Sequence, residues 1–163
     1  MAVNNKSKAL FTLSVTEGKR LIGMAVASLP IVRRAYSQGR LIIANGITNA
    51  YVAEELMGKT VTISRYTAGI VAEGRYTVTE GKTRLAPFCF EHGKESSRPW
   101  MDILEDFTDD DVFIKGANAI DLKGMAGILV ASSNGGTAGL AFGKLYSRGS
   151  HLIVPVSREK LVP

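Results

Sequence analysis

Cysteine and histidine are scarce in this sequence of 163 residues, which contains one cysteine, Cys89, and two histidines. A single cysteine excludes an intramolecular disulfide and favours a reducing, intracellular compartment. Cys89 and His92 have the spacing of two metal ligands, but structural zinc usually takes four such side chains, and the other histidine, His151, is far along the chain. We therefore expect neither a metal site nor a cofactor.

Long apolar segments are also missing. The longest apolar runs, such as residues 127–131, are far too short to cross a bilayer. Residues 1–8 lack the apolar core that is typical of a signal peptide. We expect a cytoplasmic protein with no membrane partner.

The charge of the chain has no strong local bias. The net charge of +5 and the pI near 9.4 favour an anionic partner. The basic residues are dispersed, however, and are not interleaved with aromatic side chains, so we do not expect a nucleic-acid partner. The acidic run at residues 109–111 is interpreted as a solvated loop, because three adjacent side chains cannot converge on one metal ion.

Helix signals dominate the start of the chain. Ser14 and Glu17 fit a capping box, which predicts a helix that begins there and ends near Ser28. Pro30 suits the first turn of a second helix. Gly39 suits a left-handed cap at the end of that helix.

Strand and helix patterns alternate through the rest of the chain. Residues 59–91 differ, because they are rich in Thr, Val, Tyr and Gly, which predicts a β-rich insertion. Elsewhere we predict strands over residues 41–44, 111–114, 127–131 and 152–154, and helices over residues 50–57, over 97–107 and over 138–148. The alternation predicts a single α/β domain over residues 1–163, with a three-layer α/β/α, Rossmann-like fold and a mostly parallel sheet.

Three loops rich in Gly, Asn and Thr follow predicted strands. Ligands of an open parallel sheet bind beyond the carboxyl ends of its strands, where helix amino termini and loop amides point into the crevice. The loops therefore predict one anion site, with candidate residues Asn45, Gly46, Thr48 and Asn49 in the first loop, Lys115, Gly116, Asn118 and Asp121 in the second, and Asn134, Gly135, Gly136 and Thr137 in the third. For the first loop, an ordinary turn capped by Thr48 or Asn49 is the alternative.

Two lysines extend this prediction. Lys115, at the end of a predicted buried strand, is interpreted as a fixed cation for a phosphate or carboxylate. The alternatives are an amine for Schiff-base chemistry and a surface lysine whose stem covers apolar neighbours. Lys144, on the helix after the third loop, is expected to add to the positive field.

The same loops carry a family resemblance. The segments GRLIIANGITNAYVAEEL, DDDVFIKGANAID and SHLIVPVSREKL resemble, in that order, the superfamily of ribose-phosphate isomerases, glucosamine-phosphate deaminases, certain sugar-sensing repressor domains and CoA transferases. In the isomerases the corresponding positions read Gly-Thr-Gly-Ser-Thr, which binds the substrate phosphate, then Asp-Gly-Ala-Asp-Glu-Val-Asp, and finally Asp-Ser-Lys-Leu. The resemblance covers residues 16–161, is weakest over 59–109, and implies the superfamily's fold and its tendency to form homo-oligomers.

The departures from the family pattern bear on activity. An isomerase needs a carboxylate base and a CoA transferase needs a glutamate nucleophile, yet the sequence has no Asp or Glu between Asp121 and Glu159. Asp121 itself is expected to be structural. We therefore expect binding of a phosphorylated or carboxylated metabolite without standard isomerase chemistry. The alternatives are a homo-oligomeric interaction module, or a divergent isomerase or CoA-transferase-like enzyme that uses Lys115, Asn118, Glu80, Glu91 or Glu95.

Overall fold

The main sheet of the protein has five strands. The computed structural model describes residues 8–72, 74–130 and 132–163. The strand order is β5–β4–β1–β6–β9. Parallel pairing joins β1 (Arg40–Ile43) to β6 (Val112–Ile114) and β6 to β9 (His151–Ile153). Antiparallel pairing joins β1 to β4 (Phe88–Glu91) and β4 to β5 (Lys94–Glu95). The chain is thus an α/β protein with a mixed sheet, and only its β1–β6–β9 part is parallel as predicted.

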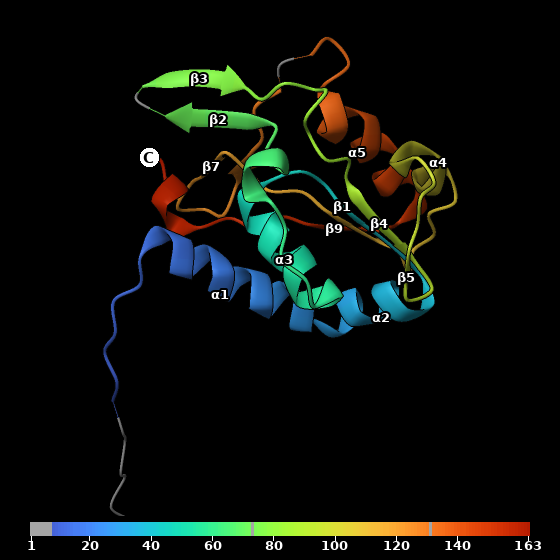
Figure 1. Cartoon of the computed structure of the whole chain (residues 1–163), viewed down its shortest axis with the longest axis horizontal. Coiled ribbons are helices and arrows are strands. Elements are labelled where there is room, and N and C mark those ends of the chain that lie inside the picture. The colour runs from blue at the N-terminus through green and yellow to red at the C-terminus, as the bar shows by residue number, and fades with distance from the viewer. Residues whose placement is uncertain (1–7, 73, 131) are drawn as a thin grey trace, which may run out of the picture.

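Helices cover both faces of this sheet. One face packs against α1 (Val15–Ser28), α2 (Pro30–Gln38) and α3 (Ile47–Met57), and the other packs against α4 (Trp100–Glu105) and α5 (Gly136–Arg148) (Figure 1). Successive residues of β1 alternate between the two cores, since Leu41 and Ile43 join the first and Ile42 joins the second. Burial on both faces explains why this strand is continuously apolar.

The helical start of the chain forms as predicted. The Ser14 amide donates to the Glu17 carboxylate at 2.7 Å, and the Glu17 amide donates to the Ser14 hydroxyl at 3.3 Å, which completes the capping box. Gly23 of α1 lies against α3, and a Cβ there would come within 2.6 Å of the Tyr51 Cβ. This close approach of α1 to α3 gives Gly23 a packing role.

Gly39 differs from its prediction. Its φ is −119°, so it is not a left-handed cap. A Cβ at Gly39 would lie 2.7 Å from Oδ1 of Asp111, which is 1% exposed. The Asp111 carboxylate accepts hydrogen bonds from the backbone amides of Arg40 and Thr108 at 2.6 and 2.7 Å. The acidic run is therefore not simply a solvated loop, because its last member is a buried acceptor for two peptide groups.

The segment predicted as a β-rich insertion is divided between two sheets. After the short helix η1 (Ile63–Arg65), β2 (Gly69–Ala72) and β3 (Arg75–Val78) form a separate antiparallel hairpin, seen at the upper left of Figure 1. The hairpin confirms the β-rich prediction for this stretch. β4, at the end of the segment, instead joins the main sheet beside β1.

The strand predicted over residues 127–131 is wrong. Among the described residues of this stretch, only β8 (Ala126–Gly127) forms, and it pairs with β7 (Ala119–Ile120) in a small antiparallel sheet of its own. Leu129 and Val130 are exposed and irregular, and residue 131 lies outside the described residues. Apolar composition alone does not supply a pairing partner, which is why the pattern failed. Within the described ranges, no helix has both the length and the apolar character needed to span a membrane.

Candidate functional site

The three predicted loops meet in one pocket at the carboxyl ends of β1 and β6. We call it the polar pocket; its volume is about 490 Å³. It is lined by predicted residues from every loop: Asn45, Gly46, Lys115, Gly116, Asn118, Gly135, Gly136 and Thr137. Asn45 follows β1 and Lys115 follows β6, and these parallel neighbours end at the same edge of the sheet.

Two helices begin at this pocket. α3 begins at Ile47, directly after Gly46, and α5 begins at Gly136, directly after Gly135. Ile47 and Gly136 both line the pocket. The first amides of a helix carry partial positive charge and are ready donors to an anion. The pocket therefore receives the positive ends of two helix dipoles.

Glycines allow the tight turn before α5. Gly135 has a left-handed φ of 72°, and a Cβ there would lie 2.8 Å from the Gly139 Cα. Gly139 is equally constrained, because its Cβ would meet the Asn134 carbonyl oxygen at 2.4 Å. Side chains at these positions would push the turn away from the first turn of α5, so the glycines fix the wall of the pocket.

Two lysine amines lie at the pocket. The amine of Lys115 donates to the Gly116 carbonyl at 3.2 Å, and the amine of Lys160, in η2 (Arg158–Lys160), donates to the Ala117 carbonyl at 2.5 Å. Both line the polar pocket. Across residues 8–72, 74–130 and 132–163, neither lysine forms a salt bridge, and no Asp or Glu lines the pocket.

The surroundings disfavour the charged form of both amines. Burial lowers the pKa of Lys115, and the nearby charge of Lys160 lowers it further. Burial also lowers the pKa of Lys160, with a contribution from Lys19 that the carboxylate of Glu159 opposes. An anion in the pocket would reverse these shifts, because an opposite charge at short range stabilises the protonated amine.

Two residues of the first predicted loop lie beneath the pocket rather than in it. Thr48 is 5% exposed, and Asn49 is fully buried. The Asn49 amide donates to the Ala44 carbonyl at 2.7 Å and to the Ile114 carbonyl at 3.5 Å, and so ties together the ends of β1 and β6. These two positions correct the prediction, because α3 begins at Ile47 and its turn directs both side chains inward. The Gly46 amide, which lines the pocket, already donates to the Tyr66 carbonyl at 2.9 Å.

Three further predicted residues hold the scaffold and do not line the pocket. Asp121 accepts from the amides of Lys123 and Met125 at 2.9 and 2.8 Å, which closes the turn between β7 and β8. Asn134 accepts from the Gly136 amide at 3.0 Å and orders the start of α5. Lys144 pairs with Glu105 of α4 and adds nothing to the pocket wall.

Two cationic residues of the pocket were not predicted from the sequence. Lys160 belongs to the stretch SREKL, which carried the family resemblance, so its position in that motif was an available signal. Arg84 reaches the pocket from the chain after the β2–β3 hairpin, and its Nε donates to the Thr79 hydroxyl at 2.9 Å. No local pattern in the sequence indicates Arg84, because its place depends on the path of the hairpin.

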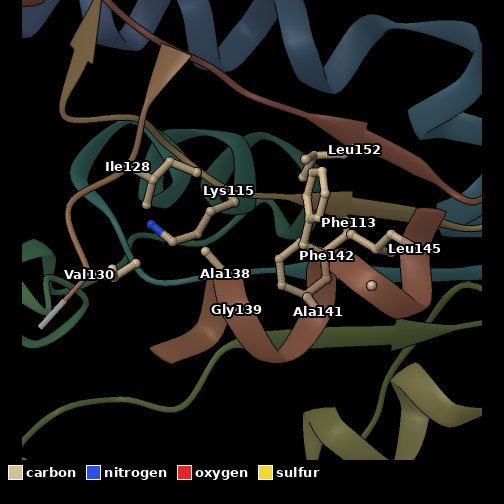
Figure 2. A pocket seen from close by; sticks show the side chains of 11 residues that line it. Phe113, Lys115, Ile128, Val130, Ala138, Gly139, Ala141, Phe142, Leu145 and Leu152 are labelled. Atoms are coloured by element: carbon tan, nitrogen blue, oxygen red, sulfur yellow. The ribbon is translucent and has the colours of Figure 1, made fainter. Parts of the chain in front are cut away.

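A second pocket adjoins the first. We call it the apolar pocket; it measures about 360 Å³ and lies between β6, β9 and α5 (Figure 2). Its wall includes Phe113, Phe142, Leu145 and Leu152. Both pockets share the residues Lys115, Ile128, Val130 and Ala138.

Metal ligands do not gather in the described part of the chain. No three His, Cys, Asp or Glu side chains come together there. Cys89 is buried, and burial, helped by the charges of Glu91 and Glu95, raises the pKa of its thiol to about 12. Such a thiol stays protonated near neutral pH and is a poor nucleophile or ligand.

Comparison with protein-family models, with curated protein sequences and with solved structures finds no significant match for this chain.

Proposed function

We propose that this chain binds an anionic small metabolite, carrying a phosphate or a carboxylate, in the polar pocket. The observation that carries the proposal is the composition of the pocket wall. Lys115 and Lys160 share it with the amino termini of α3 and α5, and the described lining contains no carboxylate. Charged donors and helix termini in one concave, partly buried site are the groups that recognise phosphate and carboxylate oxygens.

Binding without standard isomerase chemistry is supported by the same wall. Proton transfer between adjacent carbons needs a carboxylate base within hydrogen-bonding reach of the substrate. The described lining offers amines, a guanidinium, amides and hydroxyls instead. We further propose a three-layer, Rossmann-like arrangement and a divergent place in the superfamily that the loops resemble; the support is the position of the pocket at the ends of parallel strands.

A second candidate function is imine formation between Lys115 and a carbonyl compound. The lowered pKa of the Lys115 amine, which has apolar neighbours on one side, favours it. The amine would add to the carbonyl carbon, and water would leave as the C=N bond forms. Borohydride reduction in the presence of a 2-oxo acid, followed by mass spectrometry, tests this candidate. It predicts an adduct on Lys115, and an unmodified Lys115 would rule it out.

The proposed binding is tested by thermal unfolding with inorganic phosphate, sulfate and a panel of sugar phosphates. An anion at one hundred times its Kd stabilises the native state by about 2.7 kcal/mol, which raises the Tm of a chain of this size by roughly 5–10 °C. The double variant Lys115→Met, Lys160→Met should lose this shift. The matched control is Lys144→Met, whose lysine lies outside the pocket and should leave the shift intact.

Two results would contradict the proposal. One is the absence of a saturable shift with every anion of the panel. The other is an equal loss of the shift in Lys144→Met and in the double variant, which would indicate general charge screening rather than a defined site.

A further inference from the structure

The apolar pocket lies next to the polar pocket. Four residues, Lys115, Ile128, Val130 and Ala138, line both cavities, so the two cavities share part of their walls. The amine of Lys115 therefore lies at the boundary between a polar and an apolar compartment.

The side chains of the apolar pocket are arranged along one direction. Figure 2 shows the stem of Lys115 running along the wall, with its amine at the end where Ile128, Val130 and Ala138 lie. The rings of Phe113 and Phe142 stand at the opposite end, near Leu152. A group that starts at the amine and enters the pocket meets a mostly apolar wall before it reaches these rings.

The apolar wall is left partly open to water in the free protein. Phe142 is 61% exposed and Leu152 is 36% exposed, although both face a concave space. Removal of such surface from water is favourable in proportion to its area. The volume of about 360 Å³ lies within the range of small-molecule sites.

We propose that the ligand is an amphipathic anion, with a carboxylate or phosphate head at Lys115 and Lys160 and an alkyl or acyl chain in the apolar pocket. This inference rests on the proposed function, because the head is the anion of that proposal. What it adds is the substrate class: a chain-bearing acid or phosphate ester rather than a fully hydroxylated sugar phosphate. A sugar would either leave the apolar wall exposed or bring hydroxyl groups against it without hydrogen-bond partners.

Calorimetric titration with acetate, butanoate, hexanoate and octanoate measures the contribution of the chain. Hexyl phosphate and inorganic phosphate form the second arm, which distinguishes an ester head from a carboxylate head. The chain should raise affinity about fourfold for each buried methylene, until the pocket is filled. Equal affinities across both series would overturn the inference and leave anion binding standing.

Titration with hexanol shows whether the anionic head contributes to the affinity independently of the alkyl chain. It carries the same chain as hexanoate without a charge and should bind at least about tenfold more weakly. If hexanol binds as tightly as hexanoate, the anion plays no part, and both this inference and the proposed function fail.

Gly143 offers a variant that fills the apolar pocket. It lies in α5 and lines the pocket, and a Cβ built on it meets no heavy atom within 4 Å. Gly143→Leu should abolish the chain-length dependence and bring octanoate down to the affinity of acetate, while the affinity for acetate is unchanged. Gly18→Leu is the matched control, because Gly18 is also helical with open space around it but lies on α1, away from both pockets.

Light scattering on the same proteins tests whether a second copy of the chain, rather than a ligand, occupies the apolar pocket. If Gly143→Leu keeps the chain-length dependence but converts a dimer into a monomer, the apolar pocket is an interface between two copies of the chain, and the inference is overturned. An unchanged molecular mass together with lost chain-length dependence supports it.

Discussion

The charged side chains at the two ends of β1 and β6 differ in how they are paired. At the amino ends of β1 and β6, Asp111 is buried and its carboxylate is matched by the amides of Arg40 and Thr108 and by the Arg40 guanidinium. At the carboxyl ends, Lys115 and Lys160 are partly buried, and in the described structure their amines donate only to main-chain carbonyls.

Under the proposed function, the difference separates a structural charge from one held for a ligand. A buried charge that is fully matched inside the protein stabilises the fold only while every partner stays in place. A partly buried charge without an opposite charge costs stability and is retained where it serves a function. Under the proposed function, the amino ends of the strands belong to the scaffold and their carboxyl ends to the binding site.

The largest effect is expected from Asp111→Ala, which breaks the scaffold end. The substitution leaves two peptide amides without an acceptor and should lower the free energy of unfolding by about 3–5 kcal/mol. Urea denaturation measures the change. Asp110→Ala is the control: its exposed pair with Arg34 should contribute no more than about 1 kcal/mol. If both substitutions lower the free energy of unfolding equally, the buried carboxylate of Asp111 stabilises the fold no more than an exposed one.

Gly39→Ala should have the next largest effect. Its new methyl group would lie 2.7 Å from Oδ1 of Asp111, so the carboxylate must shift away from the Arg40 amide. Overpacking of this kind costs about 1–3 kcal/mol. In urea unfolding, Gly18→Ala provides the comparison, since open space surrounds Gly18 and a helical Gly→Ala change should stabilise by about 0.5–1 kcal/mol. A neutral Gly39→Ala would show that the carboxylate can move freely.

Lys115→Met is expected to act in the opposite direction at the binding end. It removes a partly buried charge and keeps the apolar stem, and should raise the free energy of unfolding by on the order of 1 kcal/mol. The same variant should bind phosphate at least about tenfold more weakly, because a charge-assisted hydrogen bond is lost. Chemical unfolding and calorimetry give the two values. A destabilised variant would place Lys115 in the scaffold instead.

The smallest effect is expected in the pH dependence of stability and of anion affinity. Because the pKa of Lys115 is lowered from its ordinary value of 10.5, the unfolded chain binds more protons between the two pKa values, and stability rises with pH in that window. Sulfate affinity should fall over the same window as the amine loses its charge. In Lys160→Met the fall should move to higher pH, since the charge of Lys160 no longer lowers the pKa of Lys115. If the pH dependence of sulfate affinity is the same in Lys160→Met as in the unmodified protein, the charge of Lys160 does not affect the pKa of Lys115.

The parts of the fold that local physics determines were predictable. The capping box at Ser14 and the ends of the helices predicted to stop at residues 57 and 148 are set by neighbours in the chain, and all three are confirmed. A left-handed glycine, Gly58 or Gly149, follows each of these two helix ends. The antiparallel place of β4 depends on its pairing with β1, far away in the sequence. In place of the strand predicted over residues 127–131, β8 pairs with β7 outside the main sheet. No pattern within a short window carries that information.

The candidate site was predictable to the same degree. The rule that ligands bind beyond the carboxyl ends of parallel strands places the first two loops together, because they follow β1 and β6. The third loop lines the same pocket although the strand predicted before it does not form. Thr48 and Asn49 were misplaced because α3 begins at Ile47, three residues earlier than predicted, and its rotation buries them. Arg84 was missed because the hairpin alone decides where it lies.

The most direct test of the account is a nuclear magnetic resonance titration of the isotope-labelled chain with inorganic phosphate. The amides of Ile47, Gly116 and Thr137, at the carboxyl ends of the strands, should shift saturably with a single Kd, while those of Arg40 and Thr108, at the amino ends, stay in place. Saturable shifts at the amino ends, or none at the carboxyl ends, would contradict the assignment of the polar pocket to anion binding.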